Sequence, residues 1–365
     1  MKILLFIIVI SYGNLFANII PTGYTIETIG IRGINNTTYI TSSGVSSGNP
    51  ASLINHEKIS IGITGQHESS MEYDLYSTGY SSLRNKRVQS IGIIIPKNDW
   101  KFGLGFNHNY NIVFDFGEVE VSNIDGETFT DNLIYNIQIK KYSIIVSKEW
   151  IVNKKNKISF GWRFNAYYYD SIVGPKTHPP NRGSDSSIGY AFGIQIITIG
   201  GFESGLLFES DTKFKYVSSN SISQVNGDGN YQSPEPTVEW TPNKYAIGLR
   251  YRLNSMISYN LEIGLTVLDE SYSPKQNFLD LSGDIVFAPF EKFIFSLGIL
   301  NIQSSIDRDG ISEHYDGKYS AVYFIGGLQF NFYGTELTYN YCNSKKFSGD
   351  WRQQYINKLS LTYTF

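Results

Sequence analysis

The chain has 365 residues, of which 41% are hydrophobic, 17% charged and 15% aromatic. This composition excludes an intrinsically disordered protein, which would be poor in hydrophobic and aromatic residues. The 30 Lys and Arg residues nearly balance 33 Asp and Glu residues, so the net charge of −3 gives no indication of nucleic-acid binding. The single cysteine, Cys342, excludes an internal disulfide and a cysteine-based metal cluster.

The first residues have the pattern of an export signal. Lys2 precedes the unbroken apolar run 3–10, and a short polar stretch then ends at the small residue Ala17. This order is typical of a secretory signal peptide, which we place at residues 1–17. A membrane anchor is the alternative, but the run is far shorter than the ~20 residues that a transmembrane helix needs. No later stretch approaches that length, so we expect an exported chain without a transmembrane helix.

Hydrophobic and polar residues alternate over long stretches of the chain. The longest is residues 100–116, whose even positions are Trp, Phe, Leu, Phe, His, Tyr, Ile, Phe and Phe. The odd positions hold Lys, Gly, Gly, Asn, Asn, Asn, Val and Asp. Residues 158–165, 245–252, 257–265 and 358–365 show the same alternation. Because successive side chains of a strand point to opposite faces, each stretch predicts a strand with one hydrophobic and one polar face.

The length of these strands distinguishes between two all-β architectures. A soluble sandwich also has one dry face, but its strands average about 5 or 6 residues. The stretches here are roughly twice as long, which suits the ~9–11 residues of a tilted transmembrane strand. Tyr and Phe gather near the strand ends, as in the aromatic girdles of membrane barrels. The sequence therefore predicts an all-β fold, a transmembrane antiparallel β-barrel with a lipid-facing hydrophobic surface and a polar lumen.

The rhythm of the connections predicts fourteen strands. We place them at 57–68, 87–95, 101–115, 133–149, 157–170, 187–198, 202–217, 241–253, 256–269, 277–288, 292–303, 317–330, 333–343 and 354–365. Short and long connections alternate between them, as the periplasmic turns and outer loops of bacterial barrels do.

Two segments leave this assignment open. Residues 71–80 fit either a loop or an additional strand. Within 133–149 the apolar set changes parity beyond Lys140 and Lys141, which we interpret as a β-bulge in that strand.

The segment before the first strand differs from the rest of the chain. Residues 18–56 are rich in Gly, Ser, Thr and Asn and show no strand alternation. A barrel wider than about eight strands is not filled by its own side chains and stays open unless it is plugged. We therefore predict that residues 18–56 form a plug, or hatch, inside a barrel made by residues 57–365.

Motifs within this segment resemble a known family. Ile31-Arg32-Gly33 is followed by Gly44-Val45-Ser46-Ser47-Gly48-Asn49-Pro50-Ala51-Ser52-Leu53, directly before the first strand. This arrangement, with its Asn49-Pro50-Ala51 turn, resembles the N-terminal hatch of long-chain fatty acid transporters of the outer membrane. The family's Met-Gly repeat is replaced here by Gly33-Ile34-Asn35-Asn36, and its acidic pair before the turn is absent.

The resemblance implies a function and a location. It implies a fourteen-stranded barrel in the outer membrane of a Gram-negative bacterium that takes up small hydrophobic or amphipathic compounds. Sister families with the same hatch and barrel include components of the type IX protein secretion apparatus, so a secretion role stays open as the alternative. We expect a monomer, inserted by the barrel assembly machinery and surrounded by membrane lipids and lipopolysaccharide.

Motifs for chemistry are scarce. The five histidines are scattered and lack metal-ligand spacing, and no nucleophile and base motif suggests an enzyme. We therefore expect no catalytic residues, no metal and no cofactor. Residues 304–316 contain several acidic side chains and could bind calcium, but they lack EF-hand spacing.

Strand parity places several charged residues in the lumen. Arg163, Arg250, Arg252, Glu262 and Lys358 are the candidate contacts for the polar end of a hydrophobic ligand. Arg250 and Arg252 lie two residues apart on one face, about 7 Å from each other, and need an anion between them. A ligand carboxylate or Glu262 would supply it. The alternative for the whole set is structural, with the charges paired to each other and to the hatch.

Overall fold

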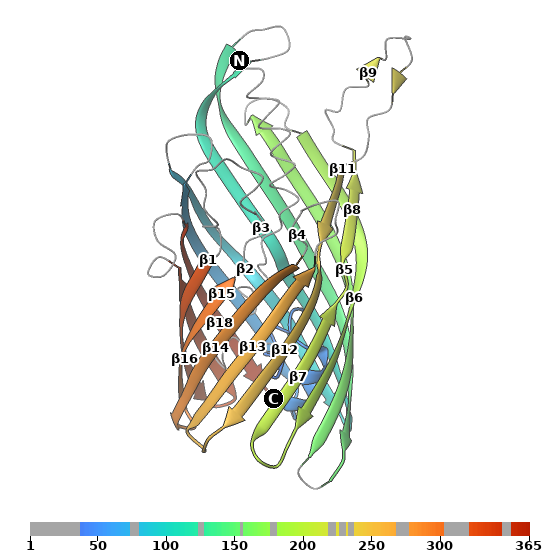
Figure 1. Ribbon diagram of the computed structural model, residues 1–365, viewed down its shortest axis with the longest axis vertical. Helices are drawn as coiled ribbons and strands as arrows, with labels where there is room; N and C mark the ends of the chain where they lie inside the picture. Colours follow the sequence, from blue (N-terminus) through green and yellow to red (C-terminus); the bar gives the residue numbers. More distant parts are fainter. Residues whose placement is uncertain are drawn as a thin grey trace.

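The chain folds into a closed antiparallel β-barrel (Figure 1). The computed structural model describes residues 37–73, 80–122, 128–153, 156–175, 181–217, 224–225, 231–232, 237–267, 277–302, 321–344 and 352–365. The barrel strands are β1 (Ser60–Tyr73), β2 (Tyr80–Lys97), β3 (Trp100–Ser122), β4 (Thr128–Ile151), β5 (Lys157–Pro175), β6 (Asn181–Ile197), β7 (Phe202–Glu209), β12 (Asn243–Arg252), β13 (Ile257–Val267), β14 (Asn277–Phe290), β15 (Phe293–Ile302), β16 (Ala321–Phe332), β17 (Thr335–Asn343) and β18 (Arg352–Thr364). These fourteen strands confirm the predicted fold class, and β1 closes the ring by pairing with β18.

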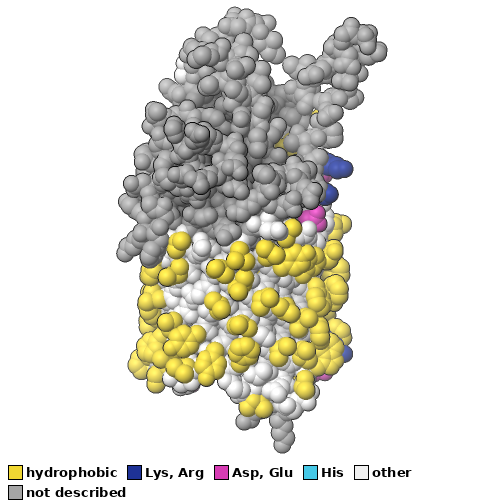
Figure 2. Space-filling view, in the orientation of Figure 1, with side chains coloured by type: hydrophobic (Ala, Val, Ile, Leu, Met, Phe, Trp, Pro, Cys, Tyr) yellow, Lys and Arg dark blue, Asp and Glu magenta, His cyan; other side chains and the backbone are white. Residues whose placement is uncertain are grey.

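The alternation of the sequence becomes the inside and the outside of the wall. On β5, Trp162 and Phe164 expose 48% and 57% of their surface, whereas Arg163 and Asn165 between them are buried. Hydrophobic side chains cover most of the described part of the visible surface, and charged groups are confined to its margins (Figure 2). In water such a surface would be an aggregation site, so it is suited to lipid. Within the described residues, no helix is long and apolar enough to cross a membrane.

The tight turns lie together at one end of the barrel, here called the short-turn end. The turn between β16 and β17 is a two-residue hairpin loop in which Tyr333 and Gly334 have φ angles of 47° and 77°. Positive φ at both positions matches the right-handed twist of the flanking strands. Ser60 and Thr364, near the two ends of the barrel domain, are paired at this end as well.

One predicted strand is divided in the structure. Residues 202–217 were expected to form a single barrel strand, but β7 ends at Glu209. Residues Thr212–Tyr216 form β8, which pairs with β11 (Thr237–Thr241) in a separate two-stranded sheet. Beyond the wall, Phe214 of β8 is fully buried and stacks on Tyr169 of β5 at 5.3 Å. A second small sheet joins β9 (Gln224–Val225) and β10 (Tyr231–Gln232).

The strands also extend beyond their predicted ends. Within 71–80, which was left open, residues 71–73 end β1 and Tyr80 begins β2, and residues 74–79 lie outside the described part. β3 and β4 likewise continue through most of the segment 116–132, which was predicted as a loop. These strands rise above their neighbours in Figure 1.

The predicted bulge in 133–149 is wrong in its position. β4 pairs with β5 without a register shift, and the extra residue is Asn109 on the facing strand β3. The apolar pattern changes along β4 because Ile137 and Ile139 point inward and are buried at 2% and 0% exposure. In the sequence alone, an apolar residue that faces the lumen therefore cannot be distinguished from a change of strand parity.

Residues 37–56, here called the hatch segment, lie inside the barrel (Figure 1). Glycines on the inner wall make room for it, since a Cβ at each would come closer than 3.0 Å to hatch atoms. They are Gly62, Gly92, Gly103, Gly105, Gly161, Gly193 and Gly205. The prediction that the chain before the first strand enters the lumen thus agrees with the placement of residues 37–56; residues 1–36 lie outside the described part, so the proposed boundary at residue 18 stays a prediction.

Adding a methyl group at one of these glycines is expected to displace the hatch segment. A Cβ on Gly161 would lie 2.3 Å from the carbonyl carbon of Pro50, which is backbone and cannot rotate away. We expect Gly161→Ala to destabilise the barrel by about 1–3 kcal/mol, the usual cost of overpacking. Gly264→Ala is the matched control because its nearest atom, on Asp280, is 3.6 Å away. Urea unfolding in detergent micelles compares the two, and equal midpoints would contradict this account of the hatch seat.

Candidate functional site

The Asn49-Pro50-Ala51 turn begins a short helix inside the lumen. Pro50 starts the 3-10 helix η1 (Pro50–Asn55), and Asn49 caps it by accepting a hydrogen bond from the backbone N–H of Ala51 at 2.9 Å. The Asn49 side-chain amide also donates to the carbonyl oxygens of Thr37 at 2.7 Å and Ile194 at 3.0 Å. One asparagine therefore joins the helix start, the preceding hatch chain and strand β6. Pro suits the first helical position because its missing N–H has no partner there anyway.

Polar side chains of the wall hold the rest of the hatch segment. Each meets a hatch group at hydrogen-bonding distance: Gln195 Nε2 with Thr38 O at 2.6 Å, Asn107 Nδ2 with Ser47 Oγ at 2.9 Å, Ser159 Oγ with Ala51 O at 3.0 Å, and Glu262 Oε2 with Thr37 N at 3.0 Å. A hatch without strand pairing needs partners for its buried backbone, and these inward side chains supply them.

Arg163 lies at the centre of a buried charge cluster. Its Nη2 donates to Glu209 Oε2 at 2.8 Å, and its Nη1 donates to the carbonyl oxygen of Gly48 in the hatch segment. Glu209 also accepts from Lys141 Nζ at 3.1 Å and from the Tyr167 hydroxyl at 2.8 Å. We call Lys141, Arg163, Tyr167 and Glu209 the charge cluster. It connects β4, β5 and β7 with the hatch segment.

The two neighbouring arginines share an acid that was not among the predicted candidates. Arg252 Nη2 lies 2.7 Å and Arg250 Nη1 3.9 Å from Glu203 Oε1 on β7. Glu262, one of the two anions considered for this position, accepts the hatch amide of Thr37. Glu203 is placed there by the register that pairs it directly with Arg250. Lys358, the remaining candidate, is buried on the inner face of β18.

Sequence reasoning missed two residues of this polar lumen, Glu203 and Glu209. Both have inward parity on β7, which was the available signal. Their partners depend on the register between strands, which alternation within a strand does not give.

Toward the end of the barrel opposite the short-turn end, here called the long-loop end, the inner wall becomes apolar. A buried cluster on the inward faces of β15 to β18 consists of Leu300, Tyr323, Ile325, Cys342 and Ile356. On the opposite part of the wall, Ile137, Ile139 and Tyr169 are buried at the inward positions of β4 and β5. We call these eight residues the apolar lining.

The wall is divided between β2 and β3 part of the way along these strands. Their pairing begins at Lys97 and Trp100 and ends at Ser90 and Asn107. Beyond this point β2 pairs only with β1, and β3 only with β4, among the described residues. We call the segments on either side of this division, 80–88 and 110–122, the seam.

Side chains bridge the base of the seam. Gln89 Nε2 donates to Asn107 Oδ1 at 2.9 Å and to the carbonyl oxygen of His108 at 2.8 Å. His108 Nδ1 meets the carbonyl oxygen of Val88 at 2.7 Å, although it lies on the facing strand. Gln89 is the extra residue at a register shift between β1 and β2. Side-chain bonds thus replace the backbone ladder here.

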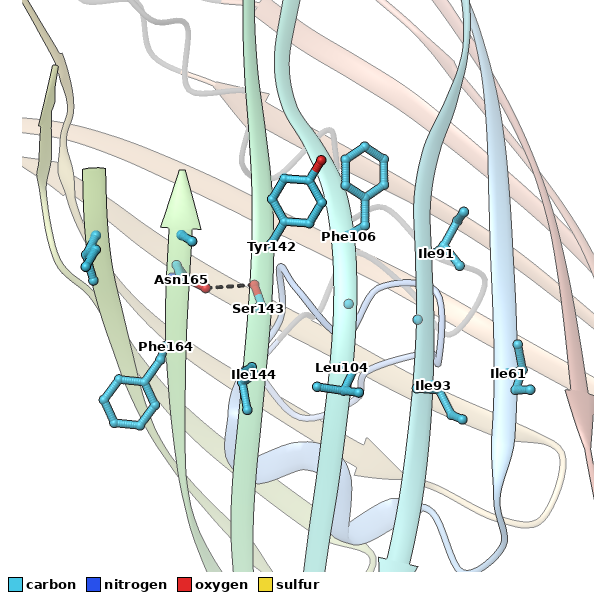
Figure 3. Close-up of a pocket in the computed structure, with 14 residues that line it drawn as sticks. Ile61, Ile91, Ile93, Leu104, Phe106, Tyr142, Ser143, Ile144, Phe164 and Asn165 are labelled. Atoms are coloured by element: carbon cyan, nitrogen blue, oxygen red, sulfur yellow. Dashed lines mark hydrogen bonds between the residues drawn. The ribbon is translucent and has the colours of Figure 1, made fainter. Parts of the chain in front are cut away.

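An apolar groove lies on the outer surface directly below the seam (Figure 3). Its volume is about 630 Å³. The side chains that face it include Ile91, Leu104, Phe106, Tyr142, Ile144 and Phe164, from β2 to β5. Behind them Ser143 donates a hydrogen bond to Asn165 at 2.8 Å on the inner face, so the polar groups of this region are satisfied away from lipid.

Metal sites are absent from the described part of the chain, where no group of three or more His, Cys, Asp or Glu side chains could hold an ion. The calcium candidate in 304–316 lies outside the described residues.

Three solved structures share this fold. A FadL homologue from Pseudomonas aeruginosa has a TM-score of 0.64 and 12% identity, over 95% of this chain and 99% of that one. The toluene transporter TbuX from Ralstonia pickettii has a TM-score of 0.64 and 10% identity, over 95% and 99%. A mutant of the monoaromatic hydrocarbon channel TodX has a TM-score of 0.65 and 12% identity, over 93% and 98%. These values confirm the predicted resemblance at the level of the fold.

No protein-family model and no curated protein matches the sequence.

Proposed function

We propose that this chain takes up small hydrophobic or amphipathic compounds across the outer membrane of a Gram-negative bacterium. In this proposal residues 1–17 direct export, and the barrel is inserted as a monomer by the barrel assembly machinery among lipids and lipopolysaccharide. The solved structures of the same fold are described as a FadL homologue, a toluene transporter and a hydrocarbon channel. No observation on this chain favours the secretion alternative, and none points to an enzyme.

The observation that carries the proposal is the seam above the apolar groove. The hatch segment occupies the lower lumen and is hydrogen-bonded to several strands of the wall, so a direct path along the barrel axis is obstructed. The seam lies in the side of the wall, directly above the apolar groove on the surface that is suited to lipid. A polar solute gains nothing by leaving water for that surface, whereas a hydrophobic solute is stabilised by about 25 cal/mol per Å² of apolar area removed from water.

The apolar lining supports the same class of ligand. A water-filled pore has a polar interior, but the inward positions near the long-loop end hold Leu300, Ile325 and Ile356. A hydrophobic compound entering from that end would meet apolar side chains first and the polar hatch seat below them. This order suits a molecule with an apolar body and, at most, one polar end.

The charged lumen residues remain candidates for that polar end. Arg163, Arg250, Arg252, Glu262 and Lys358 all lie on the inner wall or at its rim. Their contacts with Glu209, Glu203 and the hatch also fit a purely structural role. The proposal therefore assigns the route to the seam and leaves the selectivity for a head group to these residues.

A disulfide across the seam tests the proposed route. Gln89 is adjacent to Ser90, the register partner of Asn107, so cysteines at positions 89 and 107, in a Cys342→Ser background, are expected to form a staple. We expect uptake of a fluorescent long-chain fatty acid into cells to fall at least about tenfold when the staple is oxidised, because the passage depends on the seam widening. Dithiothreitol should restore it.

The control staple joins Ile95 and Phe102, which face each other where β2 and β3 are already paired. A disulfide there joins strands that are already hydrogen-bonded and leaves the seam unchanged, so uptake should be the same under oxidising and reducing conditions. Unchanged uptake with the Gln89–Asn107 staple oxidised would overturn the route through the seam.

A further inference from the structure

Lys148 occupies an unusual position on the outer surface of the barrel. It lies on β4 with the same parity as the outward-facing residues Tyr142 and Ile144, close to the short-turn end. Its ammonium is 5.0 Å from the ring centre of Trp100 and 5.0 Å from that of Trp150. A lysine on a lipid-facing surface is therefore held between two indole rings.

The register of the strands builds this arrangement. Trp100 of β3 and Phe160 of β5 are the two cross-strand partners of Lys148, and Trp150 follows two residues later on the same face. Trp150 and Phe160 also pack edge to face at 5.3 Å. Two indole rings thus lie against the ammonium, and Phe160 packs on one of them. Both Trp rings remain 42% exposed, so the site opens outward.

The position of Lys148 along the strand coincides with a membrane boundary. Lys140, eight residues earlier on the same face, lies over the ring of Tyr168 at 6.0 Å. Tyr142, Ile144 and Val146 separate the two lysines. Eight residues span about 26 Å along a strand and about 20 Å across a membrane at a tilt of ~40°, close to the ~25 Å apolar band of such barrels. The two cations therefore mark the two edges of this band.

The charge of Lys148 has no acidic partner in the described protein. None of the ion pairs found there includes it. Glu149, the adjacent residue, has the opposite parity and pairs with Lys157 at 2.8 Å. Two ring faces attract a cation but leave its N–H groups available for an oxygen acceptor. At the edge of the apolar band, the anion at the right depth is the phosphate of a lipid headgroup.

We propose that Lys148, Trp100 and Trp150 form a binding site for the phosphodiester of a glycerophospholipid in the leaflet at the short-turn end. The ammonium pairs with the phosphate oxygens, the indole rings lie beside the glycerol region, and the acyl chains run along the apolar surface of β4 and β5. The site fixes the depth of the barrel in the membrane and is independent of the proposed uptake route.

Native mass spectrometry of the full-length barrel in detergent tests the site with dimyristoyl phosphatidylglycerol as the probe. We expect one tightly bound lipid, with an affinity reduced at least about tenfold in Lys148→Gln and largely retained in Lys148→Arg. Lys157→Gln is the matched control, because it removes a charge at the same end of the barrel that already has a carboxylate partner. Heat-dependent gel mobility shows that each variant is folded.

Three outcomes would overturn the proposal. The first is equal affinity of wild type and Lys148→Gln for phosphatidylglycerol. The second is equal binding of dimyristoylglycerol, which has the same chains without the phosphate and would reveal an acyl-chain groove only. The third is displacement of the lipid by inorganic phosphate at comparable concentration, which would identify a site for a free anion.

Discussion

Removing residues 20–48 is expected to convert a nearly silent barrel into a conducting pore. The deletion takes away the hatch residues that fill the lower lumen, including Ser42, Val45 and Ser47, and leaves the η1 helix against the wall. A fourteen-stranded barrel is too wide to be filled by its own side chains. We expect single-channel conductance in planar bilayers to rise at least about tenfold over the full-length protein.

The wall must remain intact for this result to be informative. Unboiled protein should run faster than boiled protein on a gel, and its circular dichroism spectrum should be dominated by β-structure, both before and after the deletion. Equal conductance of the two folded proteins would show that the hatch segment does not close the lumen. A helical spectrum in detergent would contradict the barrel itself.

The barrel could be predicted because its signal is local. A strand that separates lipid from a polar lumen must alternate, and residues 158–165 record this directly, with Trp162 and Phe164 outward and Arg163 and Asn165 inward. The number of strands followed from counting such segments. The same reasoning went astray wherever the lumen is apolar. Ile137 and Ile139 are apolar although they face inward, so the sequence pattern was interpreted as a change of parity.

The contacts of the candidate site join residues that are far apart in the sequence. Alternation within one strand does not predict such contacts. Arg163 meets Glu209 across 46 residues because the separate registers of β5, β6 and β7 bring them to one height. Arg250 and Arg252 likewise share Glu203, which was not among the predicted candidates. Parity identified the inward face of each strand, but register fixes which inward side chains touch. The end of β7 within 202–217 was missed for a third reason. Beyond Glu209 the chain pairs with β11 and Phe214 stacks on Tyr169, and such tertiary contacts leave no mark on the alternation within the strand.

Removing the acid of the charge cluster is expected to produce the largest loss of stability among single substitutions in the lumen. Glu209 is the partner of both Lys141 and Arg163, whose side chains are fully buried. Glu209→Gln keeps the shape but leaves two buried cations without their carboxylate. Breaking a buried ion pair from one side typically costs about 3–5 kcal/mol, since the remaining charge stays desolvated. Urea unfolding followed by tryptophan fluorescence in micelles measures the change in the free energy of unfolding.

Two further variants separate this effect from a general loss of charge. Glu149→Gln removes the carboxylate of the ion pair with Lys157, which is 37% exposed, and should cost no more than about 1 kcal/mol because solvent screens that pair. Lys141→Met combined with Glu209→Gln removes one of the two stranded cations and should recover part of the stability lost in Glu209→Gln alone. Equal losses for Glu209→Gln and Glu149→Gln would mean that water reaches the cluster. In that case the contact between Arg163 and Gly48 would not hold the hatch segment in a dry lumen.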